Sequence, residues 1–484
     1  MVVLNKILFN IIFESLILSI FFYHHIFIQS KIVIPFNYYH NNIDSFIEKY
    51  TTNLLYSEIQ LGSYSPSNNG KKMSIFLNLK NSRFLLSERK VCPLTSYYNK
   101  DESTSYKYDN KISYDTFYFY TDIQASSMKK YDEISFGYSN DGISNNICGD
   151  MGLNMVNNYE NEKENIVFSL KNKKYINNYD LSFKFNEKKP FDNYGNLKGV
   201  VVIGEFPHEY DKNEFYFEQF KSTSVDIISR NEWTLKIDKL YVGLKDNQKS
   251  ILQNIDNSNE FLIKFEISYG LITGPDVYLD YIEENFFNKS EIANFCKKSK
   301  EYGNTFDYDI FVCENDIKTK FSLFPELSFY CGNFDYNFTF NYEDLFMLRN
   351  NKYYFKIIFI GGGYKLWRFG IPFLLKYRLV FNQDKKQISF YDDNIKVSKV
   401  TDNDNDNNNN SIFKSIWFWI ILVFVVVAII IVTILISKKI FGGKKRLKKA
   451  NELNDGFVYE EKRDETNNNN NQNKNVLFEN EEND

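Results

Sequence analysis

Alternation of apolar and polar side chains recurs along the chain and predicts a protein built mainly from β-strands. The pattern is clear in residues 55–61 (LYSEIQL), where it stops at Gly62, and in residues 233–242 (WTLKIDKLYV), where it stops at Gly243. A period of two places every second side chain on the same face of a sheet. Both segments are therefore expected to be strands with one face on an apolar core.

Three other segments have different apolar patterns. Residues 166–170 (IVFSL) and 199–204 (GVVVIG) are short, nearly continuous apolar runs, which are typical of buried strands. Residues 278–287 (YLDYIEENFF) carry apolar side chains three or four positions apart, which is the spacing of a helix with one apolar face. We therefore expect a surface helix in this segment.

Residues 367–391 (WRFGIPFLLKYRLVFNQDKKQISFY) dominate the C-terminal part of the pattern. A short apolar run ends at Gly370, and an extended segment is expected to follow it. Every second residue from Tyr377 to Phe381 is apolar, and the alternation resumes after residues 382–386 (NQDKK), which supply turn chemistry. The pattern predicts a β-hairpin.

The same string resembles the signature that closes the pepsin-like aspartic peptidases: W, an apolar residue, G, x, P, F, L, then K or R with Y, then V-F, an acidic turn and I-x-F-Y. Five or six motifs that resemble this family follow one another in the right order between residues 50 and 392. The resemblance implies an all-β, bilobal fold with a cleft between the lobes. It assigns residues 45–220 to the first lobe and residues 221–395 to the second.

The first catalytic motif of that family is altered. Residues 73–87 (MSIFLNLKNSRFLLS) match the family string F-T-V-I-L-D-T-G-S-S-N-L-W-V-P without a gap. In this register Asn78 stands at the catalytic Asp, Leu79 at the Thr and Lys80 at the Gly. The long cation of Lys80 replaces a residue whose lack of a side chain allows close backbone approach.

The second catalytic motif is altered less. Residues 265–275 (FEISYGLITGP) match x-D-T-G-T-S-L-I-T-G-P, and the last five residues are identical to it. Glu266 stands at the second catalytic Asp, Ile267 at the Thr and Ser268 at the Gly. Glu266 keeps a carboxylate but adds a methylene, and a misplacement of about 1 Å can cost a hundredfold in rate.

These changes bear directly on catalysis. In the family, two aspartates share one proton because like charges so close together cannot both ionise, and the pair activates a water. The amide of Asn78 can neither take the proton of a water nor return one. The hydroxyls that brace the pair are also replaced, by Leu79 and Ile267. Asn78 and Glu266 are thus the candidate site residues, and the resemblance implies an inactive site.

Other residues are weaker candidates for a functional site. Residues 148–154 (CGDMGLN) resemble D-G-I-L-G-L-G, with Asp150 at an apolar position that does no proton transfer in the family, so Asp150 is not a catalytic candidate. Tyr114 has the place of a flap tyrosine but lacks the Gly-rich hairpin around it, which favours a packed strand aromatic. His208 has no second histidine nearby, so no metal site is expected. Neither a cofactor motif nor another hydrolase motif stands in a suitable context.

The segments near both ends of the chain indicate a non-cytosolic compartment, in which cysteines can pair. There are five cysteines, of which Cys296 and Cys313 are the best disulfide pair, so one cysteine must lack an intramolecular partner. The sequence offers three glycosylation sequons, at Asn288, Asn337 and Asn409.

Two apolar segments predict the topology. Residues 1–30 have the features of a signal peptide, and residues 416–436 form an apolar run of about the ~20 residues that a bilayer core requires. A cluster of lysine and arginine follows the second segment, which predicts a type I membrane protein with its bulk lumenal or extracellular. Residues 396–415 are a polar Asn/Asp-rich linker, and residues 437–484 are expected to be a disordered cytoplasmic tail.

Length and charge are consistent with this organisation. The 484 residues suffice for two domains plus appendages, and the net charge of −4 argues against a nucleic-acid partner. The leading hypothesis is a membrane-anchored, inactive relative of the aspartic peptidases whose cleft binds a polypeptide or a partner protein. Two alternatives stay open: an active aspartic endopeptidase in which Glu266 acts with an unrecognised carboxylate, and a structural surface glycoprotein.

Overall fold

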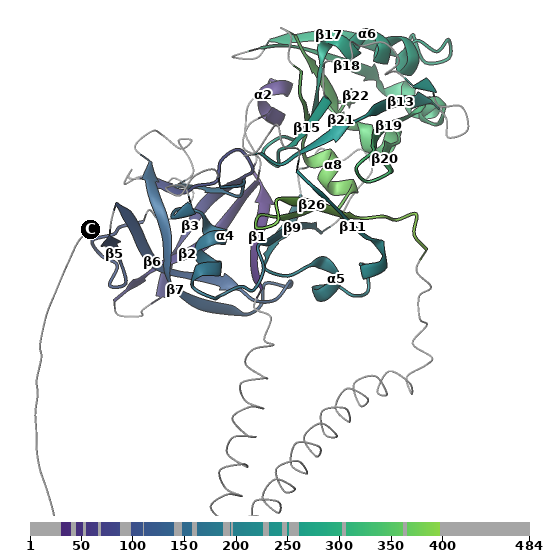
Figure 1. Cartoon of the computed structure of the whole chain (residues 1–484). Coiled ribbons are helices and arrows are strands. Elements are labelled where there is room, and N and C mark those ends of the chain that lie inside the picture. Colours follow the sequence, from purple (N-terminus) through teal and green to yellow (C-terminus); the bar gives the residue numbers. More distant parts are fainter. Residues whose placement is uncertain are drawn as a thin grey trace, which may run out of the picture. The chain divides into compact units, whose positions relative to one another are not determined.

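The computed structural model describes most of the chain between residues 31 and 396 (Figure 1). The described residues are 31–39, 45–51, 55–65, 69–87, 98–109, 111–139, 148–156, 162–186, 194, 197–225, 232–243, 249–250, 261–302, 306–361 and 365–396. The chain divides into two units, residues 1–397 and 398–484, and every described residue belongs to the first.

The largest sheet joins thirteen strands of the described residues in the order β11-β26-β25-β9-β10-β1-β2-β3-β8-β4-β7-β6-β5. Their bounds are β1 (Ile32–Tyr38), β2 (Leu55–Tyr64), β3 (Asn69–Asn78), β4 (Phe84–Ser87), β5 (Lys107–Asp109), β6 (Ile112–Tyr120), β7 (Met128–Ser139), β8 (Gly149–Gly152), β9 (Asp180–Phe185), β10 (Lys198–Ile203), β11 (Phe220–Ser224), β25 (Val380–Asn382) and β26 (Gln387–Tyr391). The C-terminal hairpin thus joins strands of the N-terminal half, since β25 pairs with β9.

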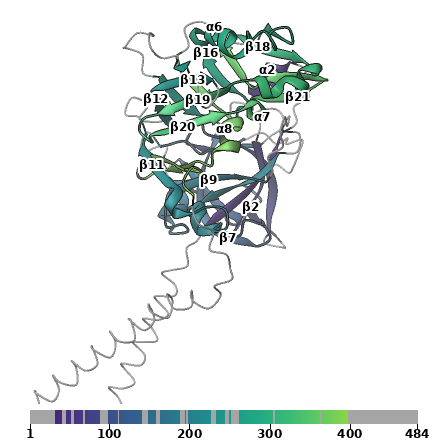
Figure 2. The same cartoon turned by 90° about the vertical axis from the view of Figure 1, so that its right-hand side faces the viewer.

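Two further sheets come from the second half of the described chain (Figure 2). One follows the order β12-β15-β24-β16-β23-β18-β22-β21, with β17 added to β18, and the other follows β14-β13-β19-β20. Their bounds are β12 (Thr234–Ile237), β13 (Lys239–Gly243), β14 (Lys249–Ser250), β15 (Phe261–Phe265), β16 (Ile272–Pro275), β17 (Cys296–Tyr302), β18 (Asp307–Glu314), β19 (Glu326–Cys331), β20 (Tyr336–Phe340), β21 (Phe346–Arg349), β22 (Lys352–Phe355), β23 (Ile357–Ile360) and β24 (Trp367–Phe369).

Helices in the described residues are short. The α-helices are α2 (Phe46–Thr51), α4 (Ile166–Asn172), α5 (Pro207–Tyr210), α6 (Leu279–Ile282), α7 (Tyr342–Leu345) and α8 (Ile371–Lys376). Short 3₁₀ segments span η1 (Phe217–Gln219), η3 (Asp276–Tyr278) and η5 (Asn315–Leu323), and η4 (Glu283–Phe287) is a π-helix. The helix predicted for residues 278–287 is confirmed, and it buries Ile282 and Phe286.

Several predicted strands are confirmed. Residues 55–61 lie in β2, residues 199–204 overlap β10, and residues 233–242 form β12 and β13. The predicted hairpin is present as β25 and β26, whose pairing runs from Val380↔Ser389 to Asn382↔Gln387. In β2 the buried side chains of residues 55–61 alternate as the pattern predicts, whereas β10 and β25 are buried on both faces.

Two predictions of extended structure are wrong. Residues 166–170 form helix α4, because the Asn165 side chain accepts a hydrogen bond from the backbone N–H of Phe168 and caps the first turn. The segment after Gly370 forms helix α8, with Pro372 in its first turn, where a missing N–H is tolerated. Both helices are apolar enough on their inner faces to be mistaken for buried strands.

Buried apolar side chains from both halves of the described chain form one continuous cluster. Trp233 illustrates the connection: it is 2% exposed, and its indole N–H donates to the carbonyl of Leu153, at 3.1 Å between Nε1 and O. The two halves therefore share a core in addition to sharing the large sheet.

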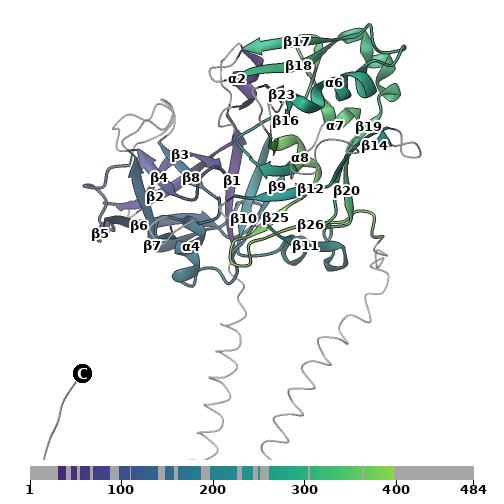
Figure 3. The same cartoon turned by 45° about the horizontal axis from the view of Figure 1, so that its top comes forward.

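Helix α2 belongs to the N-terminal half but packs on the second half (Figure 3). The ring of Phe46 stacks on Tyr354 with 4.5 Å between centroids, and the backbone N–H of Ile47 donates to Glu301 Oε2 of β17 at 3.3 Å. The carbonyl of Tyr50 accepts a hydrogen bond of 2.8 Å from the backbone N–H of Gly270. Helix α2 therefore fastens to the loop that follows Glu266.

The predicted disulfide between Cys296 and Cys313 is confirmed; these residues face each other in the pairing of β17 with β18. Cys148 is also disulfide-bonded. Cys331 is the reduced cysteine within the described residues, and burial raises the pKa of its thiol to about 11. A buried neutral thiol of this kind is a packing residue.

Several sequence predictions concern residues outside the described ranges. These are the signal peptide at residues 1–30, the membrane segment at 416–436, the tail at 437–484 and nearly all of the linker at 396–415. Within the described ranges, none of the helices is long and apolar enough to cross a membrane. The side chains of Asn288 and Asn337, two of the three sequon asparagines, are exposed.

Candidate functional site

Asn78 ends strand β3 and lies beside β8, with which β3 pairs in parallel through Asn78↔Gly152. Its side chain is buried, and its Oδ1 accepts two backbone hydrogen bonds, from Lys80 at 2.9 Å and from Asn81 at 3.1 Å. The Asn78 oxygen thus closes a tight Asx turn that fixes the course of residues 78–81.

Asp150 of β8 is the second polar group at this position. Its Oδ1 accepts a hydrogen bond from Nδ2 of Asn78, and its Oδ2 accepts one from Nδ2 of Asn81 at 2.9 Å. Burial raises the pKa of the Asp150 carboxyl to about 6, although the two amides and the charge of Lys80 favour its ionised form. The structure therefore places the Asp150 carboxyl group at the site, although the motif resemblance assigns this residue to an apolar position without a catalytic role.

Gly152 makes this arrangement sterically feasible. A Cβ atom built on Gly152 would lie 1.9 Å from Asn81 Oδ1 and 2.5 Å from the Asn81 carbonyl oxygen. Any side chain here would push the Asn81 loop away from β8. This contact explains why a glycine stands at residue 152.

Glu266 follows strand β15 and is 2% exposed. Its backbone N–H donates to the carbonyl of Phe369 at 2.9 Å, and Ser268 Oγ donates to Glu266 Oε1 at 3.4 Å. Gly370 packs directly on this loop, because a Cβ there would lie 2.2 Å from the Tyr269 carbonyl oxygen. The signature glycine near the C-terminus thus supports the Glu266 loop.

Lys80 joins the two altered motifs. Its ammonium lies 3.6 Å from Glu266 Oε1 and 4.9 Å from the centre of the Tyr269 ring. The Lys80 side chain is 41% exposed, whereas that of Glu266 is 3% exposed. The buried carboxylate is therefore paired with a cation that reaches it from the surface.

Tyr269, whose ring lies under the Lys80 ammonium, also contacts Arg368. Arg368 donates to the Tyr269 hydroxyl at 3.0 Å between Nη1 and Oη. Burial, with a smaller contribution from the negative charge of Glu266, raises the pKa of the Tyr269 hydroxyl to about 12. Tyr269 is thus a neutral hydrogen-bonding group throughout the ordinary pH range.

Leu79 and Ile267 stand where the resemblance expects bracing threonines, and both are buried in the core. Neither has a hydroxyl to orient a carboxylate. The polar contacts that hold the site come instead from Asn81, Asp150 and Ser268. These contacts hold the loops in place. The Asn78 side chain itself is an amide and carries no titratable group.

The remaining sequence candidates lie elsewhere. Tyr114 is a half-buried residue of β6. His208 of α5 forms a hydrogen bond of 2.7 Å between Nδ1 and the Tyr391 hydroxyl, and burial lowers the pKa of its imidazole. Among the described residues, no three His, Cys, Asp or Glu side chains come together in a way that could hold a metal ion.

Comparison with known proteins supports the fold alone. No family model matches the chain, and no curated protein matches its sequence. Among solved structures, basic 7S globulin from soybean matches with a TM-score of 0.51 and 11% identity, over 75% of this chain and 96% of that chain. The globulin has the fold of the pepsin-like aspartic peptidases, so this mostly β chain shares that fold. A fold does not specify an activity.

Proposed function

We propose that this chain is a membrane-anchored, pepsin-like protein that lacks peptidase activity and binds polypeptides around Lys80 and Glu266. The observation that carries the proposal is the ion pair of 3.6 Å between Lys80 and Glu266. Of the two catalytic positions, only Glu266 carries a charged group. That carboxylate is paired with Lys80, a cation from the other catalytic motif. The proposed membrane anchor is residues 416–436.

Loss of activity follows from the chemistry of proton transfer. A proton-sharing pair needs two carboxyl groups that activate a water between them. Asn78 is an amide whose oxygen already accepts hydrogen bonds from Lys80 and Asn81. The Lys80 ammonium has no carboxyl oxygen and cannot act as the second carboxyl of the pair.

Polypeptide binding is supported by the fold and by the groups at the surface of the site. Lys80 is 41% exposed and Tyr269 is half-buried, so a cation and an aromatic ring are available to a ligand. Such groups bind peptide carbonyls, carboxylates and aromatic side chains. A site of this kind would favour peptides with acidic or aromatic residues.

Peptide retention tests the binding half of the proposal. The purified full chain is incubated with a mixed peptide library, and retained peptides are identified by mass spectrometry. Lys80→Glu is expected to lower retention at least tenfold, whereas Lys198→Glu, at an exposed position of β10, leaves it unchanged. If the wild-type chain retains no more peptide than a blank resin, the binding role is wrong and a structural surface glycoprotein is favoured.

A second candidate function is supported by Asp150. An active aspartic endopeptidase would need a second carboxyl near Glu266, and Asp150 lies against Asn78 with a pKa raised to about 6 by burial. Such a carboxyl holds a proton in mildly acidic solution and could donate it. In this case Asp150→Asn and Glu266→Gln would each abolish cleavage that pepstatin inhibits.

A further inference from the structure

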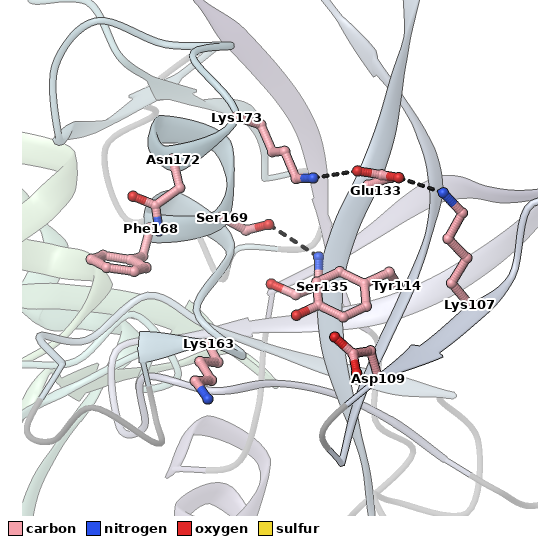
Figure 4. A pocket seen from close by; sticks show the side chains of 10 residues that line it. All are labelled: Lys107, Asp109, Tyr114, Glu133, Ser135, Lys163, Phe168, Ser169, Asn172 and Lys173. Carbon is pink, nitrogen blue, oxygen red and sulfur yellow. Dashed lines mark hydrogen bonds and ion pairs between the residues drawn. The ribbon is translucent and has the colours of Figure 1, made fainter.

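A cavity of about 420 Å³ lies in the N-terminal half, away from the residues around Glu266 (Figure 4). Strands β5, β6 and β7 and helix α4 contribute to its walls. Its lining residues are Lys107, Asp109, Tyr114, Glu133, Ser135, Lys163, Phe168, Ser169, Asn172 and Lys173. Its volume lies in the range typical of small-molecule sites.

Two cations converge on one anion at this cavity. Lys107 of β5 donates to Glu133 Oε1, and Lys173, at the end of α4, donates to Glu133 Oε2 (Figure 4). These hydrogen bonds lower the pKa of Glu133 to about 2. The two ammonium groups come from different elements and would repel each other without an anion between them.

Glu133 lies in a β-bulge and has an unusual backbone conformation. The pairing of β6 with β7 shifts between Asp115↔Ile134 and Phe117↔Tyr131, so Asp132 and Glu133 stand opposite the single residue Thr116. Glu133 has a φ of 57°, in the left-handed region that residues with a Cβ rarely adopt. Such bulges redirect side chains and are common beside binding sites.

The other walls of the cavity offer aromatic surface. Tyr114 stands beside Ser135 in Figure 4 and is half-buried, whereas the ring of Phe168 projects from α4 away from Tyr114. Helix α4 is held against β7 by a hydrogen bond of 3.0 Å from the Ser135 backbone N–H to Ser169 Oγ. The lining contains three lysines and two acidic residues, so its charge is positive overall.

We propose that this cavity binds a small organic anion in which an oxyanion group is joined to a flat ring. The oxyanion lies between Lys107 and Lys173, and the ring packs against Tyr114. Glu133 is the chain's own anion at this position, and its carboxylate shows that the two ammonium groups can bind one oxyanion together. This site is independent of the proposed polypeptide site, since the two share no residue.

Titration calorimetry of the purified full chain tests the proposal with phenyl phosphate, phenyl sulfate and benzoate as probes. Inorganic phosphate and phenol are the matched controls that each lack one half of the ligand. We expect at least one ring-bearing oxyanion to bind, with an affinity at least tenfold higher than that of either control. If no such probe binds more tightly than the controls, the proposal is wrong.

Variants locate the bound probe. The double variant Lys107→Gln, Lys173→Gln is expected to weaken its binding at least tenfold. The control Lys198→Gln, Lys212→Gln changes the charge equally at two exposed positions and is expected to leave binding within twofold of wild type. Glu133→Gln removes the internal competitor and is expected to tighten binding at least threefold. Equal weakening by both double variants, or no tightening by Glu133→Gln, would contradict the assigned site.

Discussion

The charge at residue 80 changes the electrostatics of the whole site. A glycine here would leave the buried Glu266 carboxylate facing the Asn78 loop without a cation. Lys80 instead places its ammonium 3.6 Å from that carboxylate and near the Tyr269 ring. Removal of the Lys80 ammonium would leave the buried Glu266 carboxylate without this cation.

Lys80 and Glu266 are therefore expected to be energetically coupled. Lys80→Met and Glu266→Gln should each destabilise the fold, and the double variant should lose less than the sum of the two single losses. The coupling is expected to be roughly 1 kcal/mol, because Lys80 is partly exposed to water. Urea unfolding of the four proteins measures it. Strictly additive losses would show that the pair contributes nothing.

The sequence indicated two of the residues at this site but not how they interact. Asn78 and Glu266 were located because their motifs could be followed without a gap on both sides. Asp150 could not be recognised as a partner of Asn78, because the two are 72 positions apart and meet only through the parallel pairing of β3 and β8. The ion pair of Lys80 with Glu266 could not be predicted either, because the two residues are far apart in the sequence and are brought together only by the fold.

Asp150 makes the stability of the chain depend on pH. Its pKa is raised from 3.8 to about 6 in the folded chain, so the folded state holds this proton more tightly than the unfolded state does. The stability that this proton contributes is present below pH 4 and is lost as pH rises through 6. Relative to wild type, Asp150→Asn should therefore gain roughly 2 kcal/mol of unfolding free energy between pH 4 and pH 7. Unfolding at both pH values measures this, and an unchanged difference would contradict it.

At the scale of elements, the strands were easier to predict than the short helices. Segments with a clear period of two, such as residues 55–61 and the C-terminal hairpin, were predicted correctly. Helices α4 and α8 were missed because six or seven largely apolar residues do not distinguish a helix from a buried strand. What decides α4 is a local cap, the Asn165 side chain, and an apolar pattern does not record caps.

Helix α2 belongs to the N-terminal half of the described chain but is stabilised by contacts with the second half. Phe46, Ile47 and Tyr50 are all buried, and their contacts include Tyr354, Glu301 and Gly270 of the second half. Six residues are too few to form a stable helix in isolation. The helix therefore depends on this docking.

Phe46→Ala tests the contribution of this docking. The loss of a buried ring stacked on Tyr354 is expected to cost roughly 3 kcal/mol of unfolding free energy. Phe217→Ala, at a side chain that is 68% exposed, is the matched control and is expected to change stability by less than about 0.5 kcal/mol. Denaturant unfolding of both variants checks this. Equal effects would mean that α2 does not contribute to the common core.

For the molecule as a whole, the fold and the site lead to different conclusions. One continuous core, the shared large sheet and the likeness to basic 7S globulin establish a pepsin-like fold. Activity depends on a few atoms at Asn78, Lys80 and Glu266, and these atoms are not those of a proton-sharing pair. We therefore attribute the proposed absence of peptidase activity to the residues of the site and not to a change of fold.

The most direct test is a cleavage assay of the purified full chain against a mixed peptide library from pH 3 to pH 7, with and without pepstatin. We expect no cleavage product above that of the Glu266→Gln variant at any pH, because Asn78 and Glu266 do not form a proton-sharing pair. Cleavage by the wild type that pepstatin blocks, and that Asp150→Asn and Glu266→Gln both lose, would show that the chain is an active peptidase. It would identify Asp150 and Glu266 as a working acid pair.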